Sequence, residues 1–115
     1  MTVDLNTVKI YIRPGCTDLR KGARGLTVLV QEQMKLDPFS GSVYIFCNKG
    51  RKLLKAVWWD KTGFWLAQKR LEEAKFPWPC DRGEAEELDG VQVRMLLAGI
   101  DFFKAHKPLE YRRVS

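Results

Sequence analysis

V-W-W-D-K-T-G-F-W-L-A-Q-K-R-L, residues Val57–Leu71, is the segment from which the fold of this 115-residue chain is best predicted. It holds four large aromatic residues within eight positions, namely Trp58, Trp59, Phe64 and Trp65. Between the two aromatic pairs, Asp60-Lys61-Thr62-Gly63 has the composition of a type I turn in which Gly63 takes the positive φ of a bulge. We therefore predict a β-hairpin with arms Arg51–Trp59 and Phe64–Leu71. Because each large ring buries ~150–250 Å², the hairpin should supply much of the core.

The segments before the hairpin predict two strands and a helix. Val8–Ile12 and Ser42–Cys47 are short, largely apolar runs of the kind that forms strands. Between them, apolar residues recur every three or four positions over Leu19–Lys35, which predicts a helix capped by Thr17 or Asp18. Asp37-Pro38-Phe39-Ser40-Gly41 should end this helix in a tight turn.

The segments after the hairpin predict a second helix. Apolar spacing places it over Val91–Ala98, with Asp89 as its cap and a left-handed end at Gly99 that folds Ile100 back. Glu86–Leu88 is a candidate for a short edge strand. We predict one α+β domain over residues 1–101, in which a small antiparallel sheet of about four strands packs with two main helices. Residues 102–115 form a basic C-terminal tail that we expect to be mobile or ordered by a partner.

Composition narrows the class of protein. The chain is 45% hydrophobic and 30% charged, which is typical of a globular domain, and its net charge of +6 fits a phosphate-rich partner. No apolar run is long enough to span a membrane, and the start shows no secretion signal, so we expect a cytoplasmic protein. Three widely spaced cysteines and one histidine favour free thiols over a metal site, and we expect no cofactor.

The motif Thr17–Gly25 is the first candidate for anion contact. Arg20, Lys21 and Arg24 lie on one face of the predicted helix, away from its apolar stripe. Cations in a first helical turn oppose the helix dipole, and glycines in a helix cost about 1 kcal/mol each relative to alanine. A sequence that accepts both costs can hold N–H groups and cations ready for a phosphate. The alternative is that the glycines allow tight packing while the cations pair with Asp18 or Asp60.

The hairpin is the second candidate, because residues 48–75 carry eight cations and three anions. Together the two regions supply the predicted nucleic-acid-binding residues: Arg20, Lys21, Arg24, Lys52, Lys55, Lys61, Lys69 and Arg70. Trp59 and Trp65 are candidates for stacking on bases or for binding a partner. Trp78, held extended between two prolines, is a candidate docking anchor. For each of these rings the alternative is packing in the core or over the sheet edge.

Catalysis is not indicated, and we predict no catalytic residues. A two-metal nuclease needs several carboxylates converging on its ions, whereas Asp18, Asp60, Glu72 and Asp101 are scattered along the chain. No serine or cysteine stands in a recognisable nucleophile motif. A metal-dependent nuclease therefore remains a minor alternative.

Several ordered blocks resemble one known family. They are Thr17-Asp18-Leu19-Arg20-Lys21-Gly22, Asp37-Pro38-Phe39-Ser40-Gly41, Trp59-Asp60-Lys61-Thr62-Gly63-Phe64-Trp65-Leu66, Lys69-Arg70-Leu71-Glu72, Phe76-Pro77-Trp78-Pro79 and Leu96-Leu97-Ala98-Gly99-Ile100-Asp101. With this pattern the chain resembles the TnpB-type accessory proteins encoded by the second open reading frame of IS66-group insertion sequences. The resemblance implies a small protein needed for transposition beside a separate transposase that carries the strand-cutting carboxylates. It implies no catalytic residues.

These observations lead to two main hypotheses. The first is a non-catalytic accessory factor that binds DNA at the ends of the insertion sequence through the basic helix and hairpin. The second is an interaction module that docks on the transposase of the same element with little direct DNA contact. The sequence does not indicate an oligomeric state.

Overall fold

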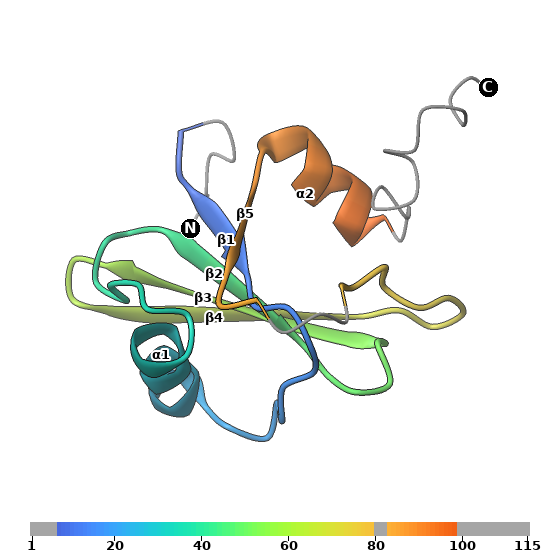
Figure 1. Ribbon diagram of the computed structural model, residues 1–115, viewed down its shortest axis with the longest axis horizontal. Coiled ribbons are helices and arrows are strands. Elements are labelled where there is room, and N and C mark those ends of the chain that lie inside the picture. Colours follow the sequence, from blue (N-terminus) through green and yellow to red (C-terminus); the bar gives the residue numbers. More distant parts are fainter. Residues whose placement is uncertain (1–6, 80–82, 99–115) are drawn as a thin grey trace.

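The computed structural model describes residues 7–79 and 83–98, which form a five-stranded sheet with two helices (Figure 1). In chain order the elements are β1 (Ile10–Ile12), α1 (Ala23–Glu32), β2 (Val43–Cys47), β3 (Leu53–Asp60), β4 (Gly63–Arg70), β5 (Glu86–Leu88) and α2 (Gly90–Leu97). The strand order across the sheet is β4-β3-β2-β1-β5. The two helices lie on opposite sides of the sheet, as Figure 1 shows.

The α+β class is confirmed, and two details of the predicted sheet are wrong. The sheet has five strands rather than about four, because the segment Glu86–Leu88 pairs with β1. It is also mixed rather than antiparallel, since β1 and β2 run parallel with Ile10 opposite Val43. The physical reason is the helix between them, because a helical crossover returns the chain to the end at which the first strand began.

The predicted hairpin is confirmed. β3 and β4 pair along their whole length, from Leu53 opposite Arg70 to Asp60 opposite Gly63. Its turn differs from the prediction, because positive φ occurs at Lys61 (55°) and not at Gly63. The pairing reaches Asp60 and Gly63, which leaves a loop of two residues. Two-residue hairpin loops favour positive φ at their first position, which is Lys61 here. Such a two-residue loop therefore takes the place of the predicted type I turn with a bulge.

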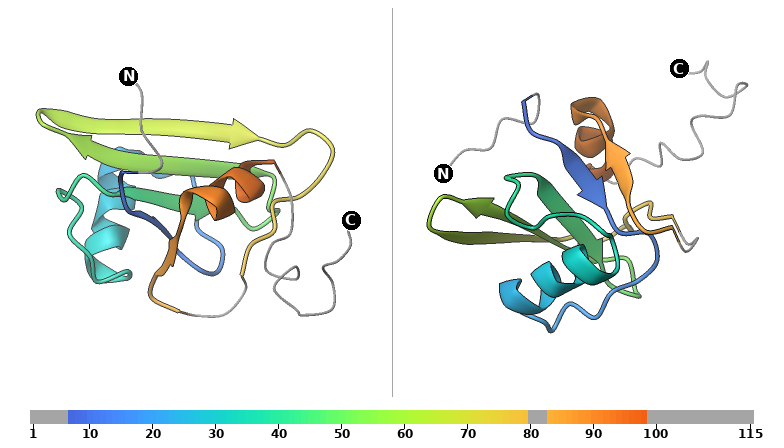
Figure 2. Two further views of the ribbon diagram at one scale, coloured as in Figure 1. Left: turned by 90° about the horizontal axis from the view of Figure 1, so that it is seen from above. Right: turned by 60° about the vertical axis from the view of Figure 1, so that its left-hand side comes forward.

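Alternation along the strands divides the core into two layers. On the α1 side, Leu26 and Val30 of the helix pack against Tyr44, Phe46 and Val57 of the sheet. On the α2 side, the buried cluster comprises Ile10, Ile12, Val43, Ile45, Cys47, Leu54, Phe76, Trp78, Leu88, Val93 and Leu96. All five residues of β2 are buried, so this strand lies between both layers, as Figure 2 makes visible.

The first helix is shorter than predicted at both ends. It begins after Gly22, whose backbone is extended and which offers no side-chain cap, so the expected cap at Thr17 or Asp18 is wrong. Asp18 instead accepts hydrogen bonds from Arg20. The helix ends before Lys35, which adopts a left-handed conformation with φ of 60°. Arg20 and Lys21 therefore lie in the loop before α1 rather than on its face.

The second helix agrees closely with the prediction. Asp89 is its N-cap and forms a capping box, accepting from the backbone N–H of Gln92 at 2.8 Å while its own N–H donates to the Gln92 side chain at 2.9 Å. The predicted left-handed end at Gly99 and the basic tail fall outside the described residues. None of the described helices has the length and apolar character needed to cross a membrane.

Candidate functional site

The parallel pairing of β1 and β2 brings two distant loops together. Because both strands end at the same edge of the sheet, the loop after β1 and the turn after β2 become neighbours. The backbone N–H of Arg13 donates to the carbonyl of Ile45 at 3.1 Å, and that of Thr17 donates to Cys47 at 2.8 Å. Residues 13–22 and 48–52 therefore form one surface, although residues 23–47 separate them in the chain.

Two long side chains fix the loop after β1, Trp78 from the α2 side of the sheet and Lys55 from the α1 side. The indole Nε1 of Trp78 donates to the carbonyls of Arg13 (3.0 Å) and Gly15 (2.9 Å). The Nζ of Lys55 donates to the carbonyl of Leu19 at 2.6 Å. Trp78 is only 6% exposed, so in this structure it packs and positions the loop instead of presenting a ring to a partner. Lys55 likewise acts on the loop.

A groove of about 510 Å³ lies between the two segments. Its walls are Cys16, Thr17, Asp18, Leu19 and Arg20 on one side and Asn48, Lys49, Gly50 and Leu53 on the other. Arg20 and Lys49 place one cation on each wall, and Asp18 places a carboxylate beside Arg20. We name this site the β1–β2 groove. Its cations come from both of the regions that the sequence marked as basic.

Asp18 and Arg20 form a bidentate ion pair within the β1–β2 groove. The Arg20 Nη2 lies 2.8 Å from Oδ2 and its Nε 3.0 Å from Oδ1, and the Arg20 backbone N–H donates to the same carboxylate. The side-chain hydrogen bonds from Arg20 hold the pKa of Asp18 well below its usual range, and Asp18 raises the pKa of Arg20. The Arg20 side chain is 91% exposed, and its Nη1 has no partner among the described residues. Arg20 thus presents one oriented nitrogen to a ligand.

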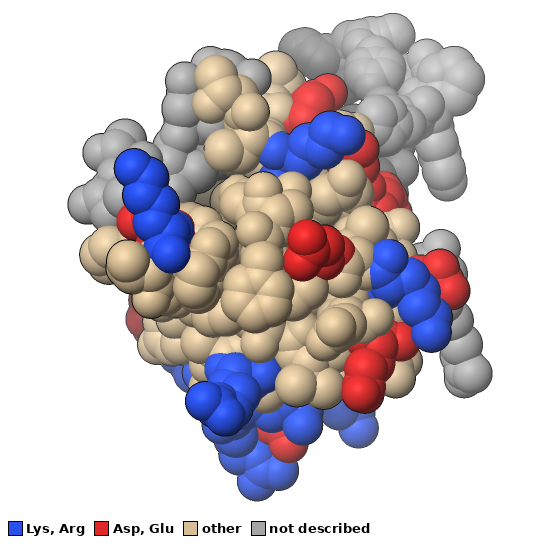
Figure 3. All heavy atoms as spheres, turned by 90° about the vertical axis from the view of Figure 1, so that its left-hand side faces the viewer, with Lys and Arg blue, Asp and Glu red and all other residues tan. Residues whose placement is uncertain are grey.

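Lys21 and Arg24 extend this basic surface to the start of α1. Both are exposed, and Gly22 between them leaves the first helical N–H groups without a side-chain cap. A Cβ placed on Gly25 would lie 2.9 Å from the Lys21 Cβ, so the glycine makes room for the lysine stem. Figure 3 shows basic side chains gathered at the lower end, where α1 lies in Figure 1. Free helical N–H groups and nearby cations are a suitable environment for an anion.

The remaining predicted cations lie on both sides of the sheet and at the tip of the hairpin. Arg70 lies opposite Leu53 and so faces the α1 side of the sheet. The Nζ of Lys69 donates to the carbonyl of Leu97 at 2.9 Å on the α2 side, and that of Lys52 reaches the carbonyl of Glu72 at 3.4 Å. Lys61 lies at the hairpin tip, and the eight residues of β3 put it roughly 25 Å from the groove edge. The eight predicted cations therefore do not form one continuous surface.

The aromatic residues of the hairpin lie on both faces, as strand alternation predicts. Trp59 packs on Phe64 and Phe39, with ring centroids 5.0 and 5.1 Å apart, on the α1 side. Trp58 stacks on Trp65 at 6.4 Å on the α2 side. Trp65 is 45% exposed, whereas Trp59 is half-buried. The two candidate rings thus belong to different surfaces.

Lys49 is the groove residue that the sequence prediction left out of its site. The prediction made the whole sheet antiparallel, and in such a sheet the turn after Ser42–Cys47 would not lie beside the loop after the first strand. The signal that could have identified it is the order strand, helix, strand over residues 8–47. That order favours parallel strands, whose following loops meet at one edge.

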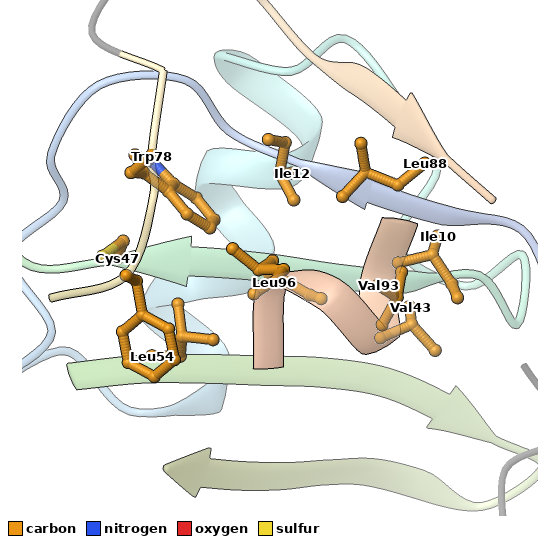
Figure 4. Packing of buried hydrophobic residues seen from close by; sticks show 11 residues of the cluster. Ile10, Ile12, Val43, Cys47, Leu54, Trp78, Leu88, Val93 and Leu96 are labelled. Carbon is orange, nitrogen blue, oxygen red and sulfur yellow. The ribbon is translucent and has the colours of Figure 1, made fainter. Parts of the chain in front are cut away.

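A second hollow lies on the opposite face, between α2 and the sheet. Its volume is about 280 Å³, and Trp58 is one of the residues that line it. Its walls also include Ile10, Val43, Leu54 and Val93, whose packing is shown in Figure 4. The Nε1 of Trp58 is buried there and has no hydrogen-bond partner among the described residues. Within residues 7–79 and 83–98, no three His, Cys, Asp or Glu side chains are arranged to hold a metal ion.

Comparison with known proteins gives one consistent result. The family model described as IS66 Orf2-like protein matches residues 8–107. The uncharacterised protein y4hO of Sinorhizobium fredii is 39% identical over 95 residues, which are 83% of either chain. A second uncharacterised protein from the same organism, y4jC, is 30% identical over 104 residues, or 90% of this chain and 89% of that one. No solved structure matches.

Proposed function

The chain belongs to the family of IS66 Orf2-like proteins, and from this we propose that it is a non-catalytic accessory protein of insertion-sequence transposition that binds the DNA backbone. The proposed contact surface is the β1–β2 groove with the adjoining start of α1. It contains the predicted residues Arg20, Lys21 and Arg24 and adds Lys49. Lys55 has a positioning role beneath it, and Arg70 lies on the same side of the sheet.

The observation that carries the proposal is the meeting of two basic segments at one edge of the sheet. Phosphate contacts need cations and N–H donors that point to a common place, and loops from parallel strands provide this without a large conformational change. The Asp18 carboxylate fixes the Arg20 guanidinium by two of its nitrogens and leaves Nη1 to donate outward. An oriented guanidinium loses less rotational freedom on binding a phosphate than a free one.

The test removes two lysines of the proposed contact surface and compares them with lysines at the opposite ends of the strands. Lys21→Ala combined with Lys49→Ala should weaken DNA binding and lower the slope of log K against log salt by about 1.8, at roughly 0.9 per lost phosphate contact. Lys9→Ala with Lys61→Ala is the charge-matched control. Lys9 lies just before the start of β1 and Lys61 lies in the turn between β3 and β4, so both are at the strand ends opposite to the groove. Titration of fluorescent duplex DNA at several salt concentrations measures both slopes.

Two results would contradict the proposal. One is a folded groove variant, checked by circular dichroism, whose affinity and slope equal those of the native chain. The other is an equal loss in the control, which would indicate attraction by net charge alone. Supercoiled plasmid incubated with the native protein and Mg²⁺ or Mn²⁺ should stay intact, and steady cleavage would favour the nuclease alternative.

Docking on the transposase is the second candidate function, and the hollow beneath α2 favours it. This apolar pocket contains a buried indole N–H, that of Trp58, which has no partner within residues 7–79 and 83–98. It therefore matches a peptide that inserts an apolar side chain and offers a carbonyl oxygen. Co-purification of the two proteins after nuclease treatment distinguishes the candidates. A complex that survives the treatment supports docking, whereas a complex that dissociates supports an association bridged by DNA.

A further inference from the structure

The strand β4 forms a free edge of the sheet. The strand order ends at β4, and no described element lies beyond it, as the left view of Figure 2 shows. Six of its eight residues are exposed, including Trp65 at 45% and Leu66 at 40%. Proteins usually protect long edge strands with proline, bulges or charges along their length, because unpaired backbone groups bind further strands. In β4 the charges are confined to Lys69 and Arg70 at one end.

The hydrogen bonds of the hairpin determine which backbone groups of β4 point outward. The N–H of Leu71 donates to the carbonyl of Lys52 at 2.9 Å, just beyond the last strand pair. Hydrogen-bonded pairs alternate along an antiparallel ladder, so Lys69, Ala67, Trp65 and Gly63 bond to β3. The N–H and C=O groups of the alternate residues therefore point to the free edge: Phe64, Leu66, Gln68 and Arg70.

We propose that β4 pairs antiparallel with β4 of a second copy of this chain, with Ala67 on the two-fold axis. A residue whose N–H and C=O point to the free edge must lie opposite another such residue. These residues all have even numbers, so the numbers of two paired residues add to an even sum. The two-fold axis then passes through a residue and not between two residues. With the axis at Ala67, seven residues of each strand overlap. Phe64 then lies opposite Arg70 of the second copy, and Leu66 lies opposite Gln68.

The side chains of β4 favour this register. Trp65 lies opposite Lys69 of the second copy, so each aromatic ring of the strand faces a cation across the interface. With the axis at Leu66, Lys69 would face Gly63 and Trp65 would face Ala67, and both cation–aromatic pairs would be lost. A parallel pairing of the two identical edges is excluded, because a two-fold axis along the strands would place N–H opposite N–H and C=O opposite C=O. Antiparallel pairing at Ala67 avoids like charges and places two small methyl groups on the axis.

The oligomeric state of the full chain is the first test. Sedimentation over a range of concentrations should show the native protein passing from monomer to dimer. Gln68→Pro removes an outward N–H while keeping every bond to β3, and prolines are tolerated at such edge positions. This variant should stay monomeric where the native chain is dimeric, and Gln68→Ala, which keeps the N–H, should dimerise. A native chain that is monomeric throughout overturns the proposal.

Cross-linking tests the register and does not depend on the proline variant folding. In a background of Cys16→Ser and Cys80→Ser, Ala67→Cys puts two thiols in a close pair with Cα atoms about 4.5 Å apart, within disulfide reach. Gln68→Cys is the matched control, because its counterpart lies beyond about 7 Å. Mild oxidation should link the first variant at least tenfold faster than the second. Equal rates overturn the pairing, and faster linkage for Leu66→Cys overturns the register.

Discussion

Trp78 illustrates how one side chain can link segments that the sequence keeps far apart. The prolines on both sides predict an extended backbone, but the direction of the ring depends on the whole fold. The indole turns into the α2-side core, and its N–H reaches the carbonyls of Arg13 and Gly15. The residue that was a candidate docking anchor is therefore better understood as a positioning residue for the β1–β2 groove.

The cysteines allow a prediction about single residues. Burial raises the pKa of the Cys47 thiol to about 12, whereas Cys16 is exposed at the groove. Alkylation requires the thiolate, so at pH 8 Cys47 is both shielded and protonated. In a Cys80→Ser variant, iodoacetamide should modify Cys16 within minutes and leave Cys47 largely unreacted, as measured by peptide mass mapping.

Denaturation provides the control for this experiment. In strong urea both thiols lose their surroundings and should react at similar rates. Rapid modification of Cys47 under native conditions would contradict the placement of its side chain between the sheet and α2.

At the level of elements, local signals were sufficient for the hairpin and the second helix. Four aromatic residues around a short polar turn predicted β3 and β4, and Asp89 predicted the start of α2, because these features depend on neighbours in sequence. The pairing of β1 with β2 depends on the path of α1 between them, so hydrophobic spacing alone could not show that the two strands are parallel. The missed parallel pairing is also why Lys49 was left out of the predicted site.

The turn Asp37–Gly41 gives a prediction at this scale. The hydroxyl of Tyr44 donates to the carbonyl of Asp37 at 2.6 Å and lies 3.0 Å from the Ser40 Oγ, which attaches the turn to β2. Burial raises the pKa of Tyr44, so the hydroxyl remains a donor well above neutral pH. Tyr44→Phe should lower the free energy of unfolding by about 1 kcal/mol, measured by urea denaturation.

Tyr11 offers a matched control, because its ring stacks on Tyr44 with centroids 5.8 Å apart and its hydroxyl forms no hydrogen bond with another described residue. Tyr11→Phe should therefore change stability by less than half as much. An equal loss in both variants would mean that the hydroxyl bond to Asp37 contributes little.

For the molecule as a whole, the excess of positive charge matters mainly through its distribution. Under the proposed function, the net charge of +6 would attract DNA without directing it, whereas the cations of the β1–β2 groove and of the start of α1 would direct DNA to the edge where β1 and β2 end. In the self-pairing proposed for β4, the two-fold axis is perpendicular to the sheet. Both copies of α1, and with them both grooves, then lie on the same face and can contact one DNA surface.

The two core layers lead to the last prediction, which concerns cooperativity. The residues of β2 face both layers, and β3 contributes Val57 to one layer and Leu54 to the other. Loss of either layer should therefore unfold the shared strands, so the chain should unfold as the single domain that the sequence predicts.

Two variants test this prediction. Leu26→Ala and Leu96→Ala each empty a fully buried site in a different layer, and each should lower the free energy of unfolding by ~2–5 kcal/mol. Leu26 and Leu96 belong to different buried clusters, so their losses of unfolding free energy should add in the double variant. Tryptophan fluorescence and far-ultraviolet circular dichroism should report one coincident urea transition in all variants. If Leu26→Ala instead loses helical signal well before the fluorescence changes, the α1 layer is a separate unit, and the loop that forms half of the groove can open while the rest of the sheet stays folded.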